Sequence, residues 1–140
     1  MEGHKINRKG IFFVLVLGSV ITSIVSTVMS TALPVIMVDF SIPASQAQMV
    51  TSIYSLVSGI MILATAFIVK RFPTKNLFFI GMGLFTIGIL CCAMAPTFSI
   101  MLLGRIIQGV GYGIIISMTQ MVILIIIPSA KRGFAMGIYG

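Results

Sequence analysis

The chain has 140 residues, of which 59% are apolar and only 8% are charged, and its mean hydropathy is +1.20. This composition lies outside the range of soluble domains and indicates an integral membrane protein. The formal net charge of +7 does not indicate a nucleic-acid partner, because most basic residues fall into three short clusters separated by apolar spans rather than into one patch.

Four apolar segments are long enough to cross a bilayer, which takes about 20 residues each. We expect them at residues 11–33, 47–69, 77–95 and 98–127. The last two are separated only by Pro96 and Thr97, a turn signal. The sequence therefore predicts an all-α membrane protein with four transmembrane helices. Its first span is too long for a signal-peptide core, so we expect it to be retained.

Outside the four spans, residues 1–10 form a polar tail and residues 133–140 resemble the beginning of a fifth span. The second segment is less than half as long as a crossing requires, so we expect further helices beyond Gly140. Residues 11–140 are accordingly interpreted as part of one larger membrane domain. We also expect that the 140 residues alone do not transport.

The positions of the basic residues predict the orientation, since short cytoplasmic loops are enriched in Lys and Arg. The clusters are Lys5, Arg8 and Lys9; Lys70, Arg71 and Lys75; and Lys131 and Arg132. With four crossings, all three lie on one side, and the opposite side has Asp39 but no basic residue. We therefore expect a multi-pass protein of the cell membrane with a cytoplasmic N-terminus. For Arg71 and Lys75, this anchoring role is the simplest interpretation.

Small hydroxyl residues mark one face of the first span. They recur at helical spacing: Ser19, Thr22, Ser23, Ser26, Thr27, Ser30 and Thr31. Such a stripe is typical of close helix packing, in which Ser and Thr can also bond to carbonyls of their own helix. The alternative is a surface that faces substrate or water.

Arg105 is the only charged residue between Lys75 and Lys131. A charge in the centre of a membrane costs about 2.5–3.5 kcal/mol on insertion scales, so it is expected to face protein or a watery cavity. Arg105 lies on one helical face with Gly109, Gly113 and Ser117, and Gln108 is adjacent. The glycines form a helix-packing motif, whereas Arg105 and Gln108 need polar partners. If the helix began at Ile106, however, Arg105 would lie at the membrane boundary.

No metal site is expected, because His4 stands alone in the tail and Cys91 and Cys92 are adjacent within an apolar span. The cysteines are interpreted as packing residues. We expect neither a cofactor nor enzymatic activity.

The segment Gly104-Arg105-Ile106-Ile107-Gln108-Gly109-Val110-Gly111 resembles the fourth-helix signature of the major facilitator superfamily. Ala32-Leu33-Pro34, at the expected end of the first helix, is similar to a motif of the drug:proton antiporters with fourteen spans. Arg71-Phe72-Pro73-Thr74-Lys75 occupies the place of the loop signature between helices 2 and 3. The likeness is greatest to the lincomycin-resistance type of multidrug exporter, including the segment from Lys131 to Gly137.

The resemblance implies the first part of a six-helix half that exports amphipathic drugs or related small molecules by alternating access, coupled to protons. Helices 1 and 4 would line the cavity with Ser23, Ser26, Thr27, Ser30, Arg105 and Gln108. Arg71 and Lys75 would then belong to the cytoplasmic gate. A fixed structural pair is the alternative role of Arg105.

The chain departs from the family pattern where an acid is usual. The loop signature has Lys70 in place of Asp, and the first-helix motif has Val25 in place of Asp. Coupling must then use Asp39, a group outside the chain, or an ion other than the proton. Alternative functions are a non-transporting or decayed four-helix fragment and a small oligomeric multidrug pump, although such pumps need a first-helix Glu that is absent here.

Overall fold

The computed structural model describes residues 8–69, 71–126, 132–133 and 137. Four long helices account for most of them: α1 (Arg8–Asp39), α2 (Ala44–Ile68), α3 (Thr74–Ala93) and α4 (Phe98–Ile126). All four are long and apolar enough to cross a membrane. The predicted class, an all-α membrane protein with four transmembrane helices, is confirmed. The expected fifth span falls almost wholly outside the described residues.

Helix α1 continues six residues past the expected end at Leu33, so the Ala32-Leu33-Pro34 triplet lies inside the helix. Pro34 lacks one backbone N–H, but the residues that follow it are apolar and continue the helix. The helix ends where Ser41 adopts a positive φ of 50° and the Ile42 N–H bonds to the Met37 carbonyl at 3.1 Å.

The other three helices each begin directly after a proline or a threonine. Pro43 and Pro73 directly precede α2 and α3, and their carbonyls accept the first helical N–H bonds, from Ala47 and Leu77 respectively. Thr97 directly precedes α4, and its hydroxyl accepts a hydrogen bond from the Ile100 N–H at 3.5 Å. Because α4 begins at Phe98, Arg105 lies about 10 Å inside the helix at about 1.5 Å per residue. The alternative of a helix beginning at Ile106 is excluded.

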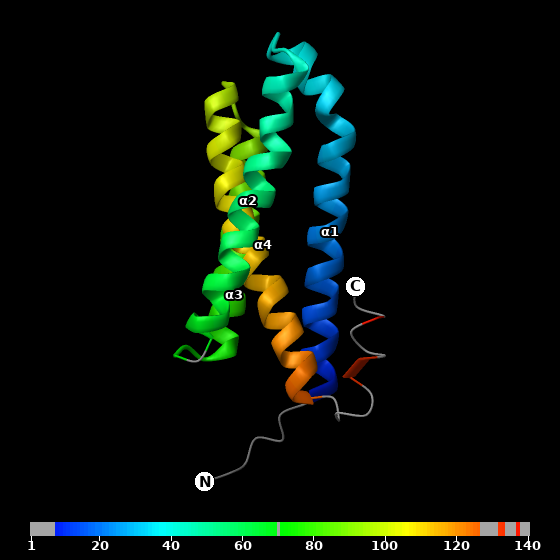
Figure 1. Cartoon of the computed structure of the whole chain (residues 1–140), viewed down its shortest axis with the longest axis vertical. Coiled ribbons are helices and arrows are strands. Elements are labelled where there is room, and N and C mark those ends of the chain that lie inside the picture. Colours follow the sequence, from blue (N-terminus) through cyan, green and yellow to red (C-terminus); the bar gives the residue numbers. More distant parts are fainter. Residues whose placement is uncertain (1–7, 70, 127–131, 134–136, 138–140) are drawn as a thin grey trace.

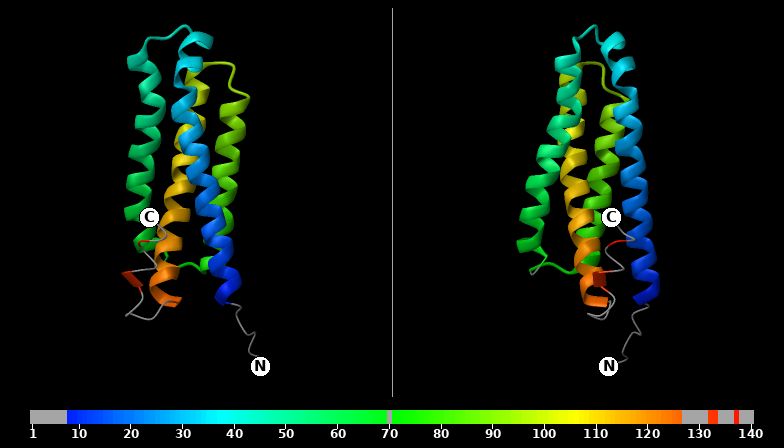
Figure 2. Two further views of the ribbon diagram at one scale, coloured as in Figure 1. Left: turned by 90° about the vertical axis from the view of Figure 1, so that its right-hand side faces the viewer. Right: turned by 45° about the vertical axis from the view of Figure 1, so that its right-hand side comes forward.

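Helix α4 is the central element of the bundle (Figures 1 and 2). In its most apolar stretch of 18 residues, 50% of the residues are buried inside the bundle, against 11–22% in the corresponding stretches of the other three helices. It packs along α2 and α3, while α1 lies beside it and makes fewer contacts. The chain reverses between α1 and α2 and between α3 and α4 at one end, and between α2 and α3 at the other. The start of α1, the α2–α3 loop and the end of α4 therefore share one end.

The contact between α3 and α4 depends on glycine, because the two backbones touch there. A Cβ atom added to Gly111 would lie 2.5 Å from the Phe85 nitrogen and 2.6 Å from the Gly81 carbonyl oxygen. One added to Gly88 would lie 2.6 Å from the Gln108 nitrogen. Only residues without a side chain allow this separation, as is common between membrane helices.

Two apolar clusters lie toward opposite ends of the bundle. One contains Val69, Leu77, Ile114 and Met118, near the α2–α3 loop. The other contains Ile36, Val50 and Met101, near the α1–α2 loop. Large apolar side chains such as Leu63, Phe79 and Leu103 are exposed on the outside, which suits contact with lipid. The segment of α4 between Met101 and Ile114 holds Arg105.

Candidate functional site

Arg105 and Gln108 form a buried polar pair on α4. The Arg105 Nη1 donates to the Gln108 Oε1 at 2.8 Å, and the two side chains are 3% and 2% exposed. The spacing of three residues places both on the same helical face. A guanidinium so thoroughly removed from solvent needs every available partner, since burial of an unpaired charge is costly.

Tyr54 of α2 is the second element of the site. Its ring lies over the Arg105 guanidinium, with 5.6 Å between the guanidinium carbon and the ring centroid, a distance at which a cation is attracted to the π face. Tyr112 lies against Tyr54, with 5.5 Å between ring centroids. We call Tyr54, Arg105, Gln108 and Tyr112 the polar layer. The sequence did not indicate Tyr54, because no motif connects a Tyr in the second span to Arg105.

Two buried donor atoms in the polar layer have no hydrogen-bond partner among the residues that the structure describes. They are the Nε of Arg105 and the hydroxyl of Tyr54, and both are shielded from solvent. Ser26 of α1 lies near the Tyr54 hydroxyl, but the two hydroxyls do not form a hydrogen bond of acceptable geometry. Buried donors of this kind normally have a partner, so these two mark a place where one is missing.

The hydroxyl stripe of α1 divides into two parts. Ser19 and Thr22 are buried, and Ser19 lies 3.2 Å from the Thr119 hydroxyl of α4. Farther along, Ser26 is half-buried, while the others are exposed: Ser23, Thr27, Ser30 and Thr31. The Thr27 hydroxyl donates to the Ser23 carbonyl at 3.1 Å, and Ser30 and Thr31 likewise bond to carbonyls one turn earlier. The stripe therefore serves close helix packing at Ser19 and Thr22 and presents an exposed polar face beyond them.

The glycine face of α4 lies against α2. A Cβ on Gly113 would be 2.6 Å from the Met61 Cβ, and one on Gly109 would be 3.0 Å from the Tyr54 carbonyl oxygen. The Ser117 hydroxyl donates to the Ile62 carbonyl of α2 at 3.0 Å. Gly104 and Gly111 form an equivalent stripe toward α3, which was not predicted. The matching seven-residue spacing of Gly81 and Gly88 could have indicated it.

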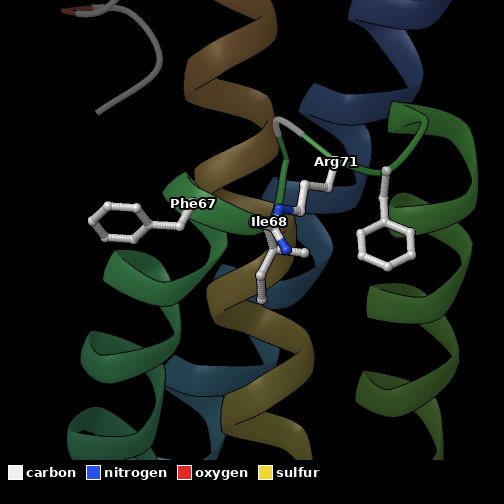
Figure 3. Close-up of a pocket in the computed structure, with 4 residues that line it drawn as sticks. Phe67, Ile68 and Arg71 are labelled. Carbon is white, nitrogen blue, oxygen red and sulfur yellow. The ribbon is translucent and has the colours of Figure 1, made fainter.

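Arg71 and Lys75 lie apart from the polar layer, at the α2–α3 loop, and both are exposed. The Arg71 N–H bonds to the Ile68 carbonyl at 2.9 Å, which closes the turn after α2. An open pocket of about 450 Å³ lies here, lined by Phe67, Ile68, Arg71 and Phe72, whose side chains are drawn in Figure 3. Its lining is almost entirely apolar, and it holds none of the cavity residues expected on α1 and α4.

The described residues contain no group of three or more His, Cys, Asp or Glu side chains that could hold a metal ion. Cys91 and Cys92 are free thiols, and the Cys92 Sγ lies 3.6 Å from the Met101 carbonyl oxygen of α4. Asp39 is exposed at the end of α1. Chemistry at the polar layer therefore rests on a guanidinium, an amide and two phenols.

The family description of the Major Facilitator Superfamily matches residues 15–140. The uncharacterized MFS-type transporter YhcA of Bacillus subtilis is 40% identical over 139 residues, which are 99% of this chain and 26% of that protein. The MFS-type transporter YcnB of the same organism is 41% identical over 140 residues, covering all of this chain and 30% of that protein. The putative multidrug resistance protein MdtD of Salmonella paratyphi B is 28% identical over 130 residues, 93% of this chain and 28% of that protein.

The chain thus spans between a quarter and a third of the length of these relatives. No solved structure matches it significantly. Four helices able to cross a membrane and a family match over nearly the whole length together show that the chain belongs to the Major Facilitator Superfamily.

Proposed function

We propose that these helices are part of a secondary transporter that exports amphipathic drugs or related small molecules by alternating access. The observation that carries the proposal is the buried Arg105–Gln108 pair on the central helix, next to an α1 with exposed hydroxyls. A charge buried in a membrane bundle normally belongs to a substrate or ion pathway. The relative named as a putative multidrug resistance protein supports drugs as cargo.

In this proposal Ser23, Ser26, Thr27 and Ser30 line one side of a central cavity, and Arg105 and Gln108 line the other. Sites of such transporters lie at the interface between repeated helical units. Helices outside these 140 residues, as in the fourteen-span drug:proton antiporters, would form the remaining walls.

The orientation is proposed from charge. The end that holds Arg71 and Lys75 faces the cytoplasm, and the end that holds Asp39 faces outward. The N-terminus is then cytoplasmic and the membrane is the cell membrane. At the cytoplasmic end, Arg71 and Lys75 would act in the gate of the transporter.

Proton coupling is the proposed energy source, and it needs a group that titrates. The sequence has two acids: Glu2, outside the described residues, and Asp39, exposed at the outer end of α1. Coupling therefore uses Asp39 or a carboxyl group on helices beyond this chain.

The test uses the natural full-length product of the gene in a bacterial strain that lacks its own drug exporters. We expect Arg105→Ala and Arg105→Lys to abolish drug resistance and dye efflux at normal expression, because Lys cannot reproduce the planar contacts of Arg with Gln108 and Tyr54. Gly83→Ala, at an open position on α3, is the matched control and retains both activities. Full resistance in both Arg105 variants would contradict the assignment.

A further inference from the structure

The polar layer carries a positive charge without a negative partner in the described part of the chain. Arg105 is buried, and none of the described residues offers it a carboxylate. Its Nη1 donates to the neutral Gln108 Oε1, and its guanidinium carbon lies over the Tyr54 ring, 5.6 Å from the centroid. A buried guanidinium is stable when an anion neutralises it, so the layer is electrostatically incomplete.

The two unpartnered donors also point to an oxyanion. The Arg105 Nε and the Tyr54 hydroxyl belong to side chains that are 3% and 6% exposed, and those side chains are in direct contact. Guanidinium and phenol groups are donors, and a carboxylate has two oxygens that only accept. Hydrogen bonds from a charged donor to a carboxylate are also the stronger kind.

We propose that the polar layer binds the carboxylate, or an equivalent oxyanion, of the transported molecule, with Arg105 and Tyr54 as the two donors. The substrates are then amphipathic anions rather than cations. This inference rests on the proposed export function and specifies its substrate class. A carboxylate side chain from a helix beyond this chain has the same chemistry and is the alternative occupant that the experiment must separate.

The surroundings of the layer suit a molecule with one charged and one apolar end. The paired rings of Tyr54 and Tyr112 offer an aromatic surface beside the guanidinium. The exposed hydroxyls of α1 reach the layer at Ser26, next to the Tyr54 hydroxyl, and form a polar route along the helix. A cationic drug would meet the charge of Arg105 where water is excluded, and like charges repel most strongly there.

The test compares three fluorescent probes that share a dansyl group and differ in charge. Dansyl-phenylalanine carries a carboxylate, its methyl ester is neutral, and dansylcadaverine is cationic. Export is measured with the natural full-length product in inverted membrane vesicles, and binding is measured by the shift in melting temperature of the purified protein. We expect the anion to be exported at least tenfold more efficiently than the ester and to raise the melting temperature.

Two variants connect this preference to the polar layer. Arg105→Gln keeps a neutral polar group; like Arg105→Ala it is expected to abolish export, and in the purified protein it is expected to make the anion and the ester equivalent in the melting-temperature shift. Tyr54→Phe keeps the ring over Arg105 but removes the hydroxyl, and a threefold to tenfold loss in anion preference is expected, as for one hydrogen bond. Thr86→Val is the matched control, since its exposed hydroxyl on α3 bonds only to its own helix, at the Met82 carbonyl, and the variant keeps the preference.

The outcomes separate the inference from the function on which it rests. If the ester or dansylcadaverine is exported better than the anion, the proposed anion site is wrong, while the proposed drug export is still supported. Export of all three at equal rates, with no change in melting temperature, indicates that a protein carboxylate occupies the layer and also overturns the inference. Export of none of the three overturns both proposals.

Discussion

A single methyl group at Gly111 is expected to separate α3 from α4. In Gly111→Ala the new Cβ lies 2.5 Å from the Phe85 nitrogen and 2.6 Å from the Gly81 carbonyl oxygen. Both neighbours are backbone atoms of a helix, so neither can rotate away as a side chain could. The helices must open by about 1 Å to restore the 3.4 Å of an ordinary contact. A gap of that size forfeits about a quarter to a half of the attraction between facing atoms.

Inserting a methyl group into a close-packed interface typically costs about 1–3 kcal/mol. We therefore expect Gly111→Ala to lower the free energy of unfolding by this amount. The fraction of molecules in which α3 and α4 are separated would then rise about fivefold to hundredfold. The control is Gly83→Ala. Gly83 lies on α3, the helix that Gly111 of α4 contacts, but nothing lies within 4 Å of the added Cβ atom. There Ala is expected to be neutral or to stabilise the helix by up to about 1 kcal/mol.

The assay follows the reaction of Cys91 and Cys92 with a thiol reagent during an SDS titration in detergent micelles. Both thiols are half-buried, and Cys92 faces α4 at the Met101 carbonyl, so opening of the α3–α4 interface exposes it. Equal thiol protection in wild type and Gly111→Ala, or an equal loss in Gly83→Ala, would refute the claim that backbone contact at glycine holds these helices together.

Three further predictions concern other contacts of the bundle. Ser117→Ala removes the bond to the Ile62 carbonyl and is expected to cost about 0.6 kcal/mol in the same titration; no change would mean that the α2–α4 contact does not depend on it. Thr119→Val removes the partner of Ser19 and is expected to speed hydrogen exchange in α1 but not in α3; equal acceleration in both contradicts a separately held α1. With Cys91 and Cys92 replaced by Ala, an impermeant maleimide is expected to label Asp39→Cys in intact cells and Arg71→Cys only after permeabilisation, and the reverse pattern contradicts a cytoplasmic N-terminus.

The number of helices was predictable because a membrane imposes a length of apolar chain, and the Pro96-Thr97 signal separates α3 from α4. The end of α1 was not, because Pro34 is a turn signal only when the following residues cannot continue a helix. Here Val35 and Val38 are exposed apolar residues that suit a membrane helix, so α1 extends to Asp39.

The contact between Arg105 and Gln108 could be predicted from α4 alone, whereas their contacts with other helices could not. The spacing of Arg105 and Gln108 places them on one face of a single helix, and their hydrogen bond follows from that geometry. Contact with Tyr54 depends on the register of α2 against α4, which is set where Gly109 and Gly113 meet Tyr54 and Met61. The residue spacing within a single helix does not determine how two helices are aligned with each other, so this contact could not be predicted.

The same packing positions the polar layer firmly and indicates which helix has to move to expose it. Backbone contacts at Gly88, Gly111 and Gly113 fix α2, α3 and α4 to one another, so Arg105 is held by three helices that cannot slide without a steric clash. Helix α1 is held differently, by side-chain contacts: Ser19 meets Thr119 toward one end and Ile36 packs with Val50 and Met101 toward the other, and the exposed hydroxyls begin between them. Opening a path to Arg105 by shifting α1 breaks side-chain contacts only, whereas shifting α2 or α3 opens a glycine interface. In the proposed transport cycle, movement is therefore expected first at α1, beside Ser26 and Tyr54.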